Sequence, residues 1–353
     1  MNRFEYIRAE SVTEAATEMA RPGSVLLAAG TNLLDLMKVD VLRPKRLIDI
    51  THLPDLDRIE TMEDGSVRIG AMVRNSDLAF DETFAAAFPA VAEALLSGAS
   101  PQLRNAATVG GNLLQRTRCR YFYDTASACN KRAPGAGCDA IDGENRGHAI
   151  LGWSTHCIAT HPSDFCVALA AFDATVEIES ANDWRCVPLA DFHRLPGDDP
   201  GNETVLAPGE LIVAVRLPAK SAAFAGHARY LKVRERTSYA FALVSAAAGL
   251  DFADDGTIRA ARIALGGVAP KPWRAEAAEA MLVGGVASPE LFAEAGRSAL
   301  ADAEPSGDNA YKIELTQRVV ARVLANAAAG TPDTMPALPA SPFAPVSGGP
   351  VHA

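Results

Sequence analysis

The sequence predicts an α+β fold built from several units. Three observations predict it: a strand that runs into a Gly-containing turn at residues 25–30, hairpin patterns at 58–70 and 174–187, and strands at 228–265 followed by helices at 273–328. Strands that precede helices within one segment are typical of α+β domains. At roughly 150 residues per domain, a chain of 353 residues also suggests two or three domains.

The first predicted unit covers residues 1–54. Ser11 followed by Glu14 is a capping-box pattern, and it predicts that a short helix begins there and runs to Met19. A small apolar run that ends in a turn predicts a strand that feeds a loop. We therefore expect strands at 25–28 and 46–50 and a short helix at 32–38 between them.

The second predicted unit covers residues 55–220 and contains a Cys-rich insertion at 115–160. Alternating residues on both sides of Glu63-Asp64-Gly65 predict a hairpin. Apolar spacing predicts helices at 75–80, 89–96 and 163–172. A second hairpin is expected at 174–187, and a strand at 210–217 is ended by Pro218.

A composition shift at 219–225 marks the boundary to a third unit at 226–330. We expect strands at 228–233, 242–252 and 257–265, then helices at 273–282, 289–300 and 310–328. Residues 331–353 are rich in Pro, Gly, Ser and Ala, so they can bury little apolar surface. We expect this tail to be disordered or draped on a partner.

The bulk composition is that of an ordinary globular protein. Hydrophobic residues make up 48% and charged residues 22%, and the formal net charge is −10. Nucleic-acid-binding surfaces are usually basic, so we expect no nucleic-acid partner. No targeting segment and no apolar stretch long enough for a membrane span is visible, which favours a cytoplasmic protein.

Two Gly-containing loops are candidate cofactor-binding segments. Loop one is residues 28–34, Ala-Ala-Gly-Thr-Asn-Leu-Leu, and loop two is residues 108–113, Thr-Val-Gly-Gly-Asn-Leu. A loop that leaves a strand and opens a helix aims backbone N–H groups at a phosphate. In loop two, Gly110 and Gly111 permit close approach of the backbone, and Asn112 offers an acceptor and two donors. Loop one alone is a weak motif, because a plain strand–turn–helix looks the same.

Four of the six cysteines cluster between residues 119 and 157. These are Cys119, Cys129, Cys138 and Cys157, and four thiolates can complete the coordination shell of one metal site. Their wide, irregular spacing differs from that of a zinc finger, although zinc and free thiols both stay open. His148, His156 or His161 could replace a thiolate. We interpret Cys166 and Cys186, which lie in apolar or strand-like contexts, as buried structural thiols.

Loop one, loop two and His161-Pro162-Ser163-Asp164 before an Ala/Leu-rich helix resemble the FAD-binding subunits of the xanthine dehydrogenase family. These proteins belong to molybdenum hydroxylases and aldehyde oxidoreductases, and the resemblance covers about residues 1–330. It implies a two-subdomain FAD-binding domain of the vanillyl-alcohol-oxidase/PCMH type. A C-terminal α+β domain of the CO-dehydrogenase flavoprotein type would follow it.

The resemblance also implies residues that bind FAD. The two loops would hold the pyrophosphate, Asp164 would lie near the adenosine or ribitol end, and Lys232 would lie near the flavin ring. The full implied set is Ala28, Ala29, Gly30, Thr31, Asn32, Leu33, Thr108, Gly110, Gly111, Asn112, Leu113, Asp164 and Lys232. The family usually has Gly where this chain has Ala29. Either that position has an ordinary φ here, or loop one is slightly reshaped.

The cysteines resemble one branch of this family. The flavin subunits of 4-hydroxybenzoyl-CoA reductase and of periplasmic-type aldehyde oxidoreductases carry an insertion that holds a [4Fe–4S] cluster, and residues 118–157 look most like the latter. The implied cluster ligands are Cys119, Cys129, Cys138 and Cys157. Arg118, Arg120, Lys131 and Arg132 would offset the charge of a reduced cluster and raise its potential.

The implied function is that of an electron-transfer subunit with FAD and a [4Fe–4S] cluster. Its partners would be a small [2Fe–2S] subunit and a large molybdenum-cofactor subunit, in a heterotrimer or a dimer of heterotrimers. Substrate would be oxidised on the large subunit, so no catalytic residue is expected here, and an external acceptor would take the electrons. Co-export with a partner that carries a twin-Arg signal would place the complex in the periplasm. A stand-alone FAD oxidoreductase and a metal-stapled assembly protein without redox turnover are the alternatives.

Overall fold

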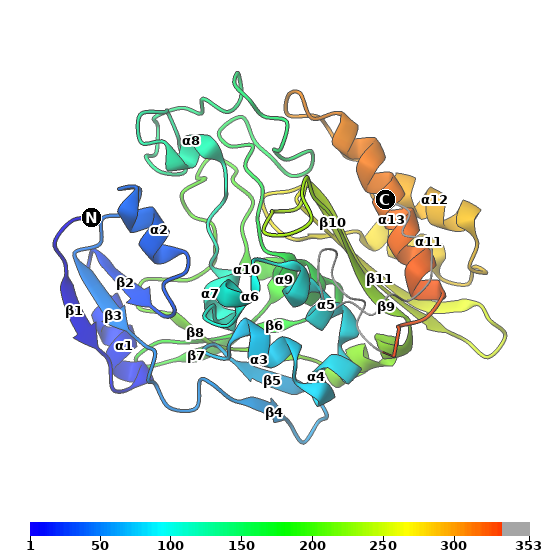
Figure 1. Ribbon diagram of the computed structural model, residues 1–353, viewed down its shortest axis with the longest axis horizontal. Helices are drawn as coiled ribbons and strands as arrows, with labels where there is room; N and C mark the ends of the chain where they lie inside the picture. The colour runs from blue at the N-terminus through cyan, green and yellow to red at the C-terminus, as the bar shows by residue number, and fades with distance from the viewer. Residues whose placement is uncertain (334–353) are drawn as a thin grey trace.

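The computed structural model describes residues 1–333, and the last part of the predicted tail, 334–353, lies outside the described residues. Three β-sheets divide the described chain, at residues 5–49, 59–217 and 228–274 (Figure 1). The Cys-rich segment carries one short helix, α8 (Arg120–Tyr123), and rises above the sheets in the view of Figure 1. None of the helices among residues 1–333 is long and apolar enough to cross a membrane.

The first sheet is parallel and has the order β1-β3-β2, where β1 is Glu5–Arg8, β2 is Ser24–Leu27 and β3 is Arg46–Asp49. Helix α1 (Val12–Met19) begins where the capping box predicted, because the Ser11 hydroxyl accepts from the Glu14 N–H. The Glu14 carboxylate reaches back to the Glu10 N–H, one residue before the cap. Helix α2 (Leu33–Lys38) follows β2, as the pattern in loop one predicted.

The second sheet has the order β4-β5-β8-β6-β7 and all its pairs are antiparallel. Both predicted hairpins are confirmed, since β4 (Ile59–Thr61) pairs with β5 (Val67–Gly70) and β6 (Thr175–Glu179) pairs with β7 (Trp184–Pro188). Strand β8 (Leu211–Leu217) lies in the centre of the sheet. Seven helices accompany this sheet: α3 (Asn75–Ala79), α4 (Glu82–Ala87), α5 (Pro89–Ser97), α6 (Pro101–Arg104), α7 (Val109–Leu113), α9 (Asp164–Ala171) and α10 (Leu189–Phe192).

The third sheet is antiparallel with the order β12-β11-β10-β9. Its strands are β9 (Ala228–Val233), β10 (Val244–Phe252), β11 (Ile258–Gly266) and β12 (Trp273–Arg274), after a 3-10 helix at Ala219–His227. Helices α11 (Glu276–Leu282), α12 (Pro289–Ser298) and α13 (Tyr311–Ala328) lie beside it, on the right in Figure 1. The largest apolar core of the second sheet includes residues of β9 to β11, so the two units pack together.

Two sequence predictions are wrong. The expected helix at 273–282 begins only at Glu276, because Trp273 and Arg274 pair with Leu265 and Ala264 as a strand. Cys186 is exposed rather than buried, because β7 is an edge strand and this side chain points away from the core. Cys166 in α9 is buried, as predicted.

Candidate functional site

Loop one leaves β2 and opens α2 with a left-handed glycine. Gly30 has a positive φ of 74°, whereas Ala29 has a negative φ, which any L-residue adopts. Ala in place of the usual Gly therefore requires no reshaping of the loop. Within residues 1–333, no acceptor meets the backbone N–H groups of Gly30, Thr31 and Asn32. Unpaired N–H groups in a half-buried loop favour an anionic ligand at this position.

Loop two is helical and uses its N–H groups internally. Residues 109–113 form α7, in which Gly110 donates to the Ala71 carbonyl at 2.8 Å and Gly111 donates to the Thr108 hydroxyl at 3.3 Å. A Cβ on Gly110 would lie 2.9 Å from the Ala71 Cβ. The close approach that we expected from Gly110 is therefore to a neighbouring strand end, and it lets α7 pack beside β5.

Two cavities meet at loop one. A cavity of about 280 Å³ is lined by residues 28–33 together with Thr108, Gly110 and Gly111. A second cavity, of about 480 Å³, is lined by Asn112, Asp164 and Lys232 among others. Thr31 and Asn32 line both cavities, so loop one separates them. The structure thus brings together twelve of the thirteen residues that the sequence implied for FAD.

The thirteenth residue, Leu113, lies elsewhere. Its side chain is fully buried in the apolar core, and its carbonyl accepts a hydrogen bond from Nε2 of His193 at 2.9 Å. Leu113 therefore anchors the end of loop two in the apolar core, and it lines neither of the two cavities.

Asp164 and Lys232 form an ion pair at the wall of the larger cavity. Lys232 Nζ lies 2.7 Å from Asp164 Oδ2, and both side chains are more than 90% buried. Tyr230 donates to the other carboxylate oxygen at 2.6 Å, and burial together with that carboxylate raises the pKa of Tyr230 well above its usual value. The sequence implied two separate positions along FAD for Asp164 and Lys232, whereas the structure pairs them with each other.

The four clustered cysteines line one small cavity in the Cys-rich segment. Cys129 and Cys138 face each other across an isolated antiparallel bridge, and Cys119 begins the short helix α8. Burial raises the pKa of the Cys119 thiol to about 11 and also raises the pKa of the Cys138 and Cys157 thiols. A metal that binds here must displace these protons.

The spacing of the four sulfur atoms differs from that of a mononuclear zinc site. Tetrahedral zinc with Zn–S bonds of about 2.3 Å holds its sulfur ligands about 3.8 Å apart. Within residues 1–333, the one group of three or more such ligand atoms lying within 4.8 Å of one another is His161, Cys166 and His193, so no three of the four clustered cysteines are that close. The four thiols are thus not arranged as the closed ligand shell of one zinc ion.

The basic residues that the sequence assigned to the cluster have other partners. Lys131 donates to Glu203 at 2.8 Å, Arg132 donates to the carbonyls of Tyr121 and Phe122, and Arg120 pairs with Glu144. Lys131 still acts on Cys157, where its charge partly offsets the rise in pKa that burial causes. Of the three histidines, His148 contacts a cysteine, with Nε2 3.2 Å from the Cys119 sulfur.

Comparison with known proteins identifies the two parts of the chain. Residues 2–220 match the family described as the FAD binding domain in molybdopterin dehydrogenase, and residues 229–327 match the CO dehydrogenase flavoprotein C-terminal domain. The chain belongs to the FAD-binding subunits of the molybdopterin dehydrogenases. It is thus a flavoprotein subunit of an oxidoreductase, as the sequence motifs implied.

Relatives and solved structures of this family match over nearly the whole chain. The aldehyde oxidoreductase FAD-binding subunit PaoB of Escherichia coli (strain K12) is 51% identical over 93% of this chain and 99% of its own. The carbon monoxide dehydrogenase medium chain of Hydrogenophaga pseudoflava is 31% identical over 91% and 96%. A crystal structure of quinoline 2-oxidoreductase from Pseudomonas putida 86 has a TM-score of 0.71 and 26% identity over 93% and 98%. A structure of the Hydrogenophaga pseudoflava carbon monoxide dehydrogenase gives 0.72 and 30% over the same shares.

The residues at the two cavities fit FAD, the cofactor of this family. Loop one offers N–H groups that have no acceptor among the described residues, and the smaller cavity beside it is lined mostly by apolar residues such as Val25, Leu26 and Leu36. The larger cavity adds polar and cationic side chains. A long ligand with a charged middle and two ring systems suits such a divided site.

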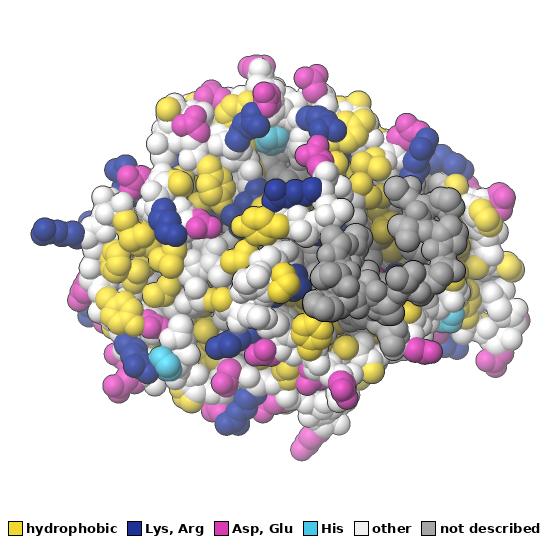
Figure 2. Space-filling view, in the orientation of Figure 1, with side chains coloured by type: hydrophobic (Ala, Val, Ile, Leu, Met, Phe, Trp, Pro, Cys, Tyr) yellow, Lys and Arg dark blue, Asp and Glu magenta, His cyan; other side chains and the backbone are white. Residues whose placement is uncertain are grey.

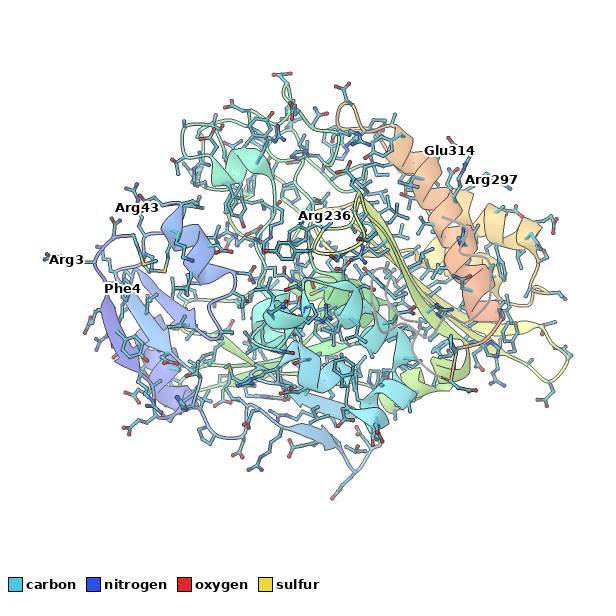
Figure 3. The ribbon with its side chains drawn as sticks, in the orientation of Figure 1. Arg3, Phe4, Arg43, Arg236, Arg297 and Glu314 are labelled. Carbon is cyan, nitrogen blue, oxygen red and sulfur yellow. The ribbon has the colours of Figure 1, made fainter. Side chains whose placement is uncertain are left out.

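Sequence reasoning missed several residues at the larger cavity. Asn75 lies there with a buried side-chain oxygen that has no hydrogen-bond partner within residues 1–333, and Arg236, Tyr239 and Phe241 come from the segment between β9 and β10. Figure 3 shows Arg236 near the middle of the molecule, between the Cys-rich segment and the helices below it. The basic and aromatic composition of 234–241 was the signal in the sequence, and only the fold carries it to loop one.

Proposed function

We propose that this chain is the FAD and iron–sulfur subunit of a molybdenum-containing aldehyde oxidoreductase. The observation that carries the proposal is 51% identity over almost the full length of an aldehyde oxidoreductase FAD-binding subunit. Electrons released by an aldehyde on a large molybdenum-cofactor subunit pass through a small [2Fe–2S] subunit to this chain and then to an external acceptor. FAD supplies the ability to take two electrons and to release them singly or in pairs.

The FAD-binding residues that we propose are residues 28–33 of loop one, Thr108, Gly110, Gly111 and Asn112 of loop two, and Asp164 and Lys232. Gly30, Thr31 and Asn32 present N–H donors toward the pyrophosphate, and Gly110 packs α7 against Ala71 so that the two loops stay close. The Lys232–Asp164 pair keeps a fixed cation at the cavity wall while the carboxylate limits its net charge. Each role belongs to binding and positioning, because the redox chemistry is that of the cofactor.

We propose in addition that Cys119, Cys129, Cys138 and Cys157 hold a [4Fe–4S] cluster. Support comes from their common cavity and from a sulfur spacing in which no three of the four atoms lie within 4.8 Å of one another, whereas tetrahedral zinc holds its sulfur ligands about 3.8 Å apart. His148 would then donate to the Cys119 sulfur in the tautomer that carries its proton on Nε2, and burial lowers the pKa of this imidazole. A hydrogen bond to a cluster sulfur raises its reduction potential.

The partners are part of the proposal. Relatives of this chain are named as medium chains and FAD-binding subunits, which supports association with a small and a large subunit in a heterotrimer or its dimer. The surface shown in Figure 2 carries acidic and basic side chains interspersed, with exposed apolar groups between them, which is compatible with docking of protein subunits. The complex would reach the periplasm by co-export, with a twin-Arg signal on a partner.

The test is an absorption spectrum of the anaerobically purified full chain with FAD, iron and zinc assayed on the same sample. We expect flavin bands, an iron–sulfur shoulder and about four irons per chain. Cys129→Ser should remove the iron and leave most of the flavin. Zinc without iron would refute the redox cluster and keep the flavoprotein, whereas iron without flavin would refute the FAD-binding assignment.

A further inference from the structure

We propose that Arg118 is a binding residue for FAD, whose guanidinium meets an anionic part of the cofactor at the larger cavity. The anionic part is either the pyrophosphate or the ring of the reduced flavin. The inference takes FAD as the ligand, as the proposed function does, but it needs no cluster. It reassigns a residue that sequence reasoning gave to the neighbouring cysteine site.

The guanidinium of Arg118 contacts loop one, and Arg118 is not among the described residues that line the cysteine cavity. Although Arg118 directly precedes Cys119, its Nη2 donates to the Asn32 side-chain oxygen and its Nη1 donates to the Tyr123 hydroxyl at 2.7 Å. Asn32 is one of the two residues that line both cavities. Arg118 also lines the larger cavity itself, so its side chain lies where the cofactor would pass loop one.

Aromatic rings fix the guanidinium before a ligand arrives. Its central carbon lies 4.8 Å from the Phe241 ring centroid and 5.9 Å from that of Tyr123. Stacking of this kind adds cation–π attraction and restricts a side chain that otherwise has many rotamers. Binding then loses little further side-chain entropy, which is the condition for a preorganised site.

The charge and one donor of Arg118 lack a partner among residues 1–333. In the part of the chain that the structure describes, no carboxylate lies within 4.0 Å of this guanidinium, and its Nε is buried without an acceptor. A buried donor left unpaired is costly, and an anion at the cavity wall would satisfy it. Lys232, the neighbouring cation, differs because Asp164 already takes its charge.

Arg120 provides a matched control on the other side of Cys119. It has the same charge and the same separation along the chain from that cysteine, but its guanidinium pairs with Glu144 and is 65% exposed. Any effect of general positive charge near the cysteines should therefore appear in both Arg118→Gln and Arg120→Gln. A specific contact with FAD should appear in Arg118→Gln alone.

The experiment measures the dissociation constant of FAD and the flavin midpoint potential of the full chain, with iron content and thermal stability on the same samples. Loss of a charge-assisted hydrogen bond should weaken the binding of FAD, in both redox forms or in the reduced form alone, about tenfold to a hundredfold in Arg118→Gln. The dissociation constant of FAD for Arg118→Lys should lie between those of Arg118→Gln and the wild type, because lysine keeps the charge and loses the planar guanidinium with its paired donors. Arg120→Gln should stay within about twofold of the wild type.

The flavin midpoint potential distinguishes a contact with the pyrophosphate from a contact with the reduced flavin ring. If Arg118 contacts the pyrophosphate, both redox forms of FAD bind more weakly in Arg118→Gln and the potential stays constant. If it contacts the reduced ring, the reduced form alone is weakened, and a tenfold loss lowers the potential by about 30 mV for two electrons. Either result supports the proposal.

Unchanged affinity and potential in Arg118→Gln, or equal losses in the Arg118 and Arg120 variants, would overturn it. If Arg118→Gln fails to fold, Phe241→Leu tests the same contact by removing the stacking partner, and FAD affinity as in the wild type would then count against the proposal. A wild-type chain that binds no FAD at all would overturn the proposed function together with this inference.

Discussion

Loop one and loop two have similar sequences and do different work. Both contain Asn-Leu shortly after a Gly, and both precede a short helix or form one. In loop one the N–H groups of Gly30, Thr31 and Asn32 have no acceptor among residues 1–333, whereas in loop two the N–H groups of residues 109–112 all have one. The backbone N–H groups of loop one are available to a ligand. Those of loop two are used in hydrogen bonds that keep α7 packed beside β5, at the wall of the smaller cavity.

The comparison shows that a glycine motif does not reveal which surface its glycine faces. Gly30 adopts a left-handed conformation at the cavity, and Gly110 lies against the protein itself. Substitutions should therefore separate FAD affinity from folding stability, with loop one affecting mainly the first and loop two mainly the second.

The largest effect should come from Gly110→Ala. The new Cβ would lie 2.9 Å from the Ala71 Cβ and 3.2 Å from its carbonyl oxygen, and neither atom belongs to a flexible side chain. We expect overpacking to cost about 1–3 kcal/mol, measured by urea unfolding, with FAD lost as a consequence. Gly111→Ala is the control, because its Cβ meets only the Thr108 hydroxyl at 3.0 Å and alanine favours the helix. Equal losses in both variants would contradict the packing role of Gly110.

The second largest effect should be a loss of folding stability at acidic pH, because His193, which donates to the Leu113 carbonyl of loop two, is buried. Burial lowers the pKa of His193 to about 4, while an unfolded histidine titrates near 6.5. Below about pH 6.5 the unfolded chain therefore binds a proton that the folded chain excludes until about pH 4. Stability should fall across this window as pH decreases, by up to about 1.4 kcal/mol per pH unit. His193→Gln can still donate to the Leu113 carbonyl, and its unfolding should depend less on pH over the same range. An identical pH dependence in both proteins would show that His193 is not a source of the acid sensitivity.

In loop one, Gly30→Ala should reduce FAD affinity more than folding stability. A left-handed φ of 74° and a Cβ 2.9 Å from the end of the Leu34 side chain strain the variant by about 1 kcal/mol. FAD affinity should fall more than this cost suggests, because the free N–H groups beside it move. Titration of FAD into the flavin-free protein measures the affinity, with Ala29→Gly as the control that should bind FAD as well as the wild type. Full FAD affinity in Gly30→Ala would contradict the assignment of loop one.

Periodicity and turn chemistry predicted most strands and helices, because these depend on neighbours in sequence. The Ser11 cap and both hairpins are of this kind. What the sequence could not show depends on contacts between distant residues. The Lys232–Asp164 pair joins positions 68 residues apart, and the partner of Arg118 is 86 residues away. Arg118 stands beside a cysteine in the sequence, so sequence reasoning assigned its charge to the cysteine site, whereas its guanidinium contacts Asn32 in loop one.

The helical form of loop two was also missed, for a local reason. Two consecutive glycines reduce helix propensity, so residues 109–113 have the composition of a turn. The Thr108 hydroxyl compensates by capping the Gly111 N–H, and the strand end at Ala71 fixes the first turn. A cap of this kind is visible in sequence only if the residues after it are already expected to be helical.

The smallest and sharpest comparison is a pair of Thr→Val substitutions. The Thr108 hydroxyl caps α7, so Thr108→Val should cost about 1 kcal/mol of unfolding free energy. The Thr31 side chain lines both cavities and makes no hydrogen bond within residues 1–333, so Thr31→Val should keep its stability within about 0.5 kcal/mol. If that hydroxyl meets FAD instead, its loss should weaken binding by about twofold to tenfold. The two substitutions are chemically identical. A loss of FAD affinity in Thr31→Val and a loss of stability in Thr108→Val would therefore assign FAD binding to loop one and a structural role to loop two. A loss of stability in Thr31→Val, or of FAD affinity alone in Thr108→Val, would reverse that division.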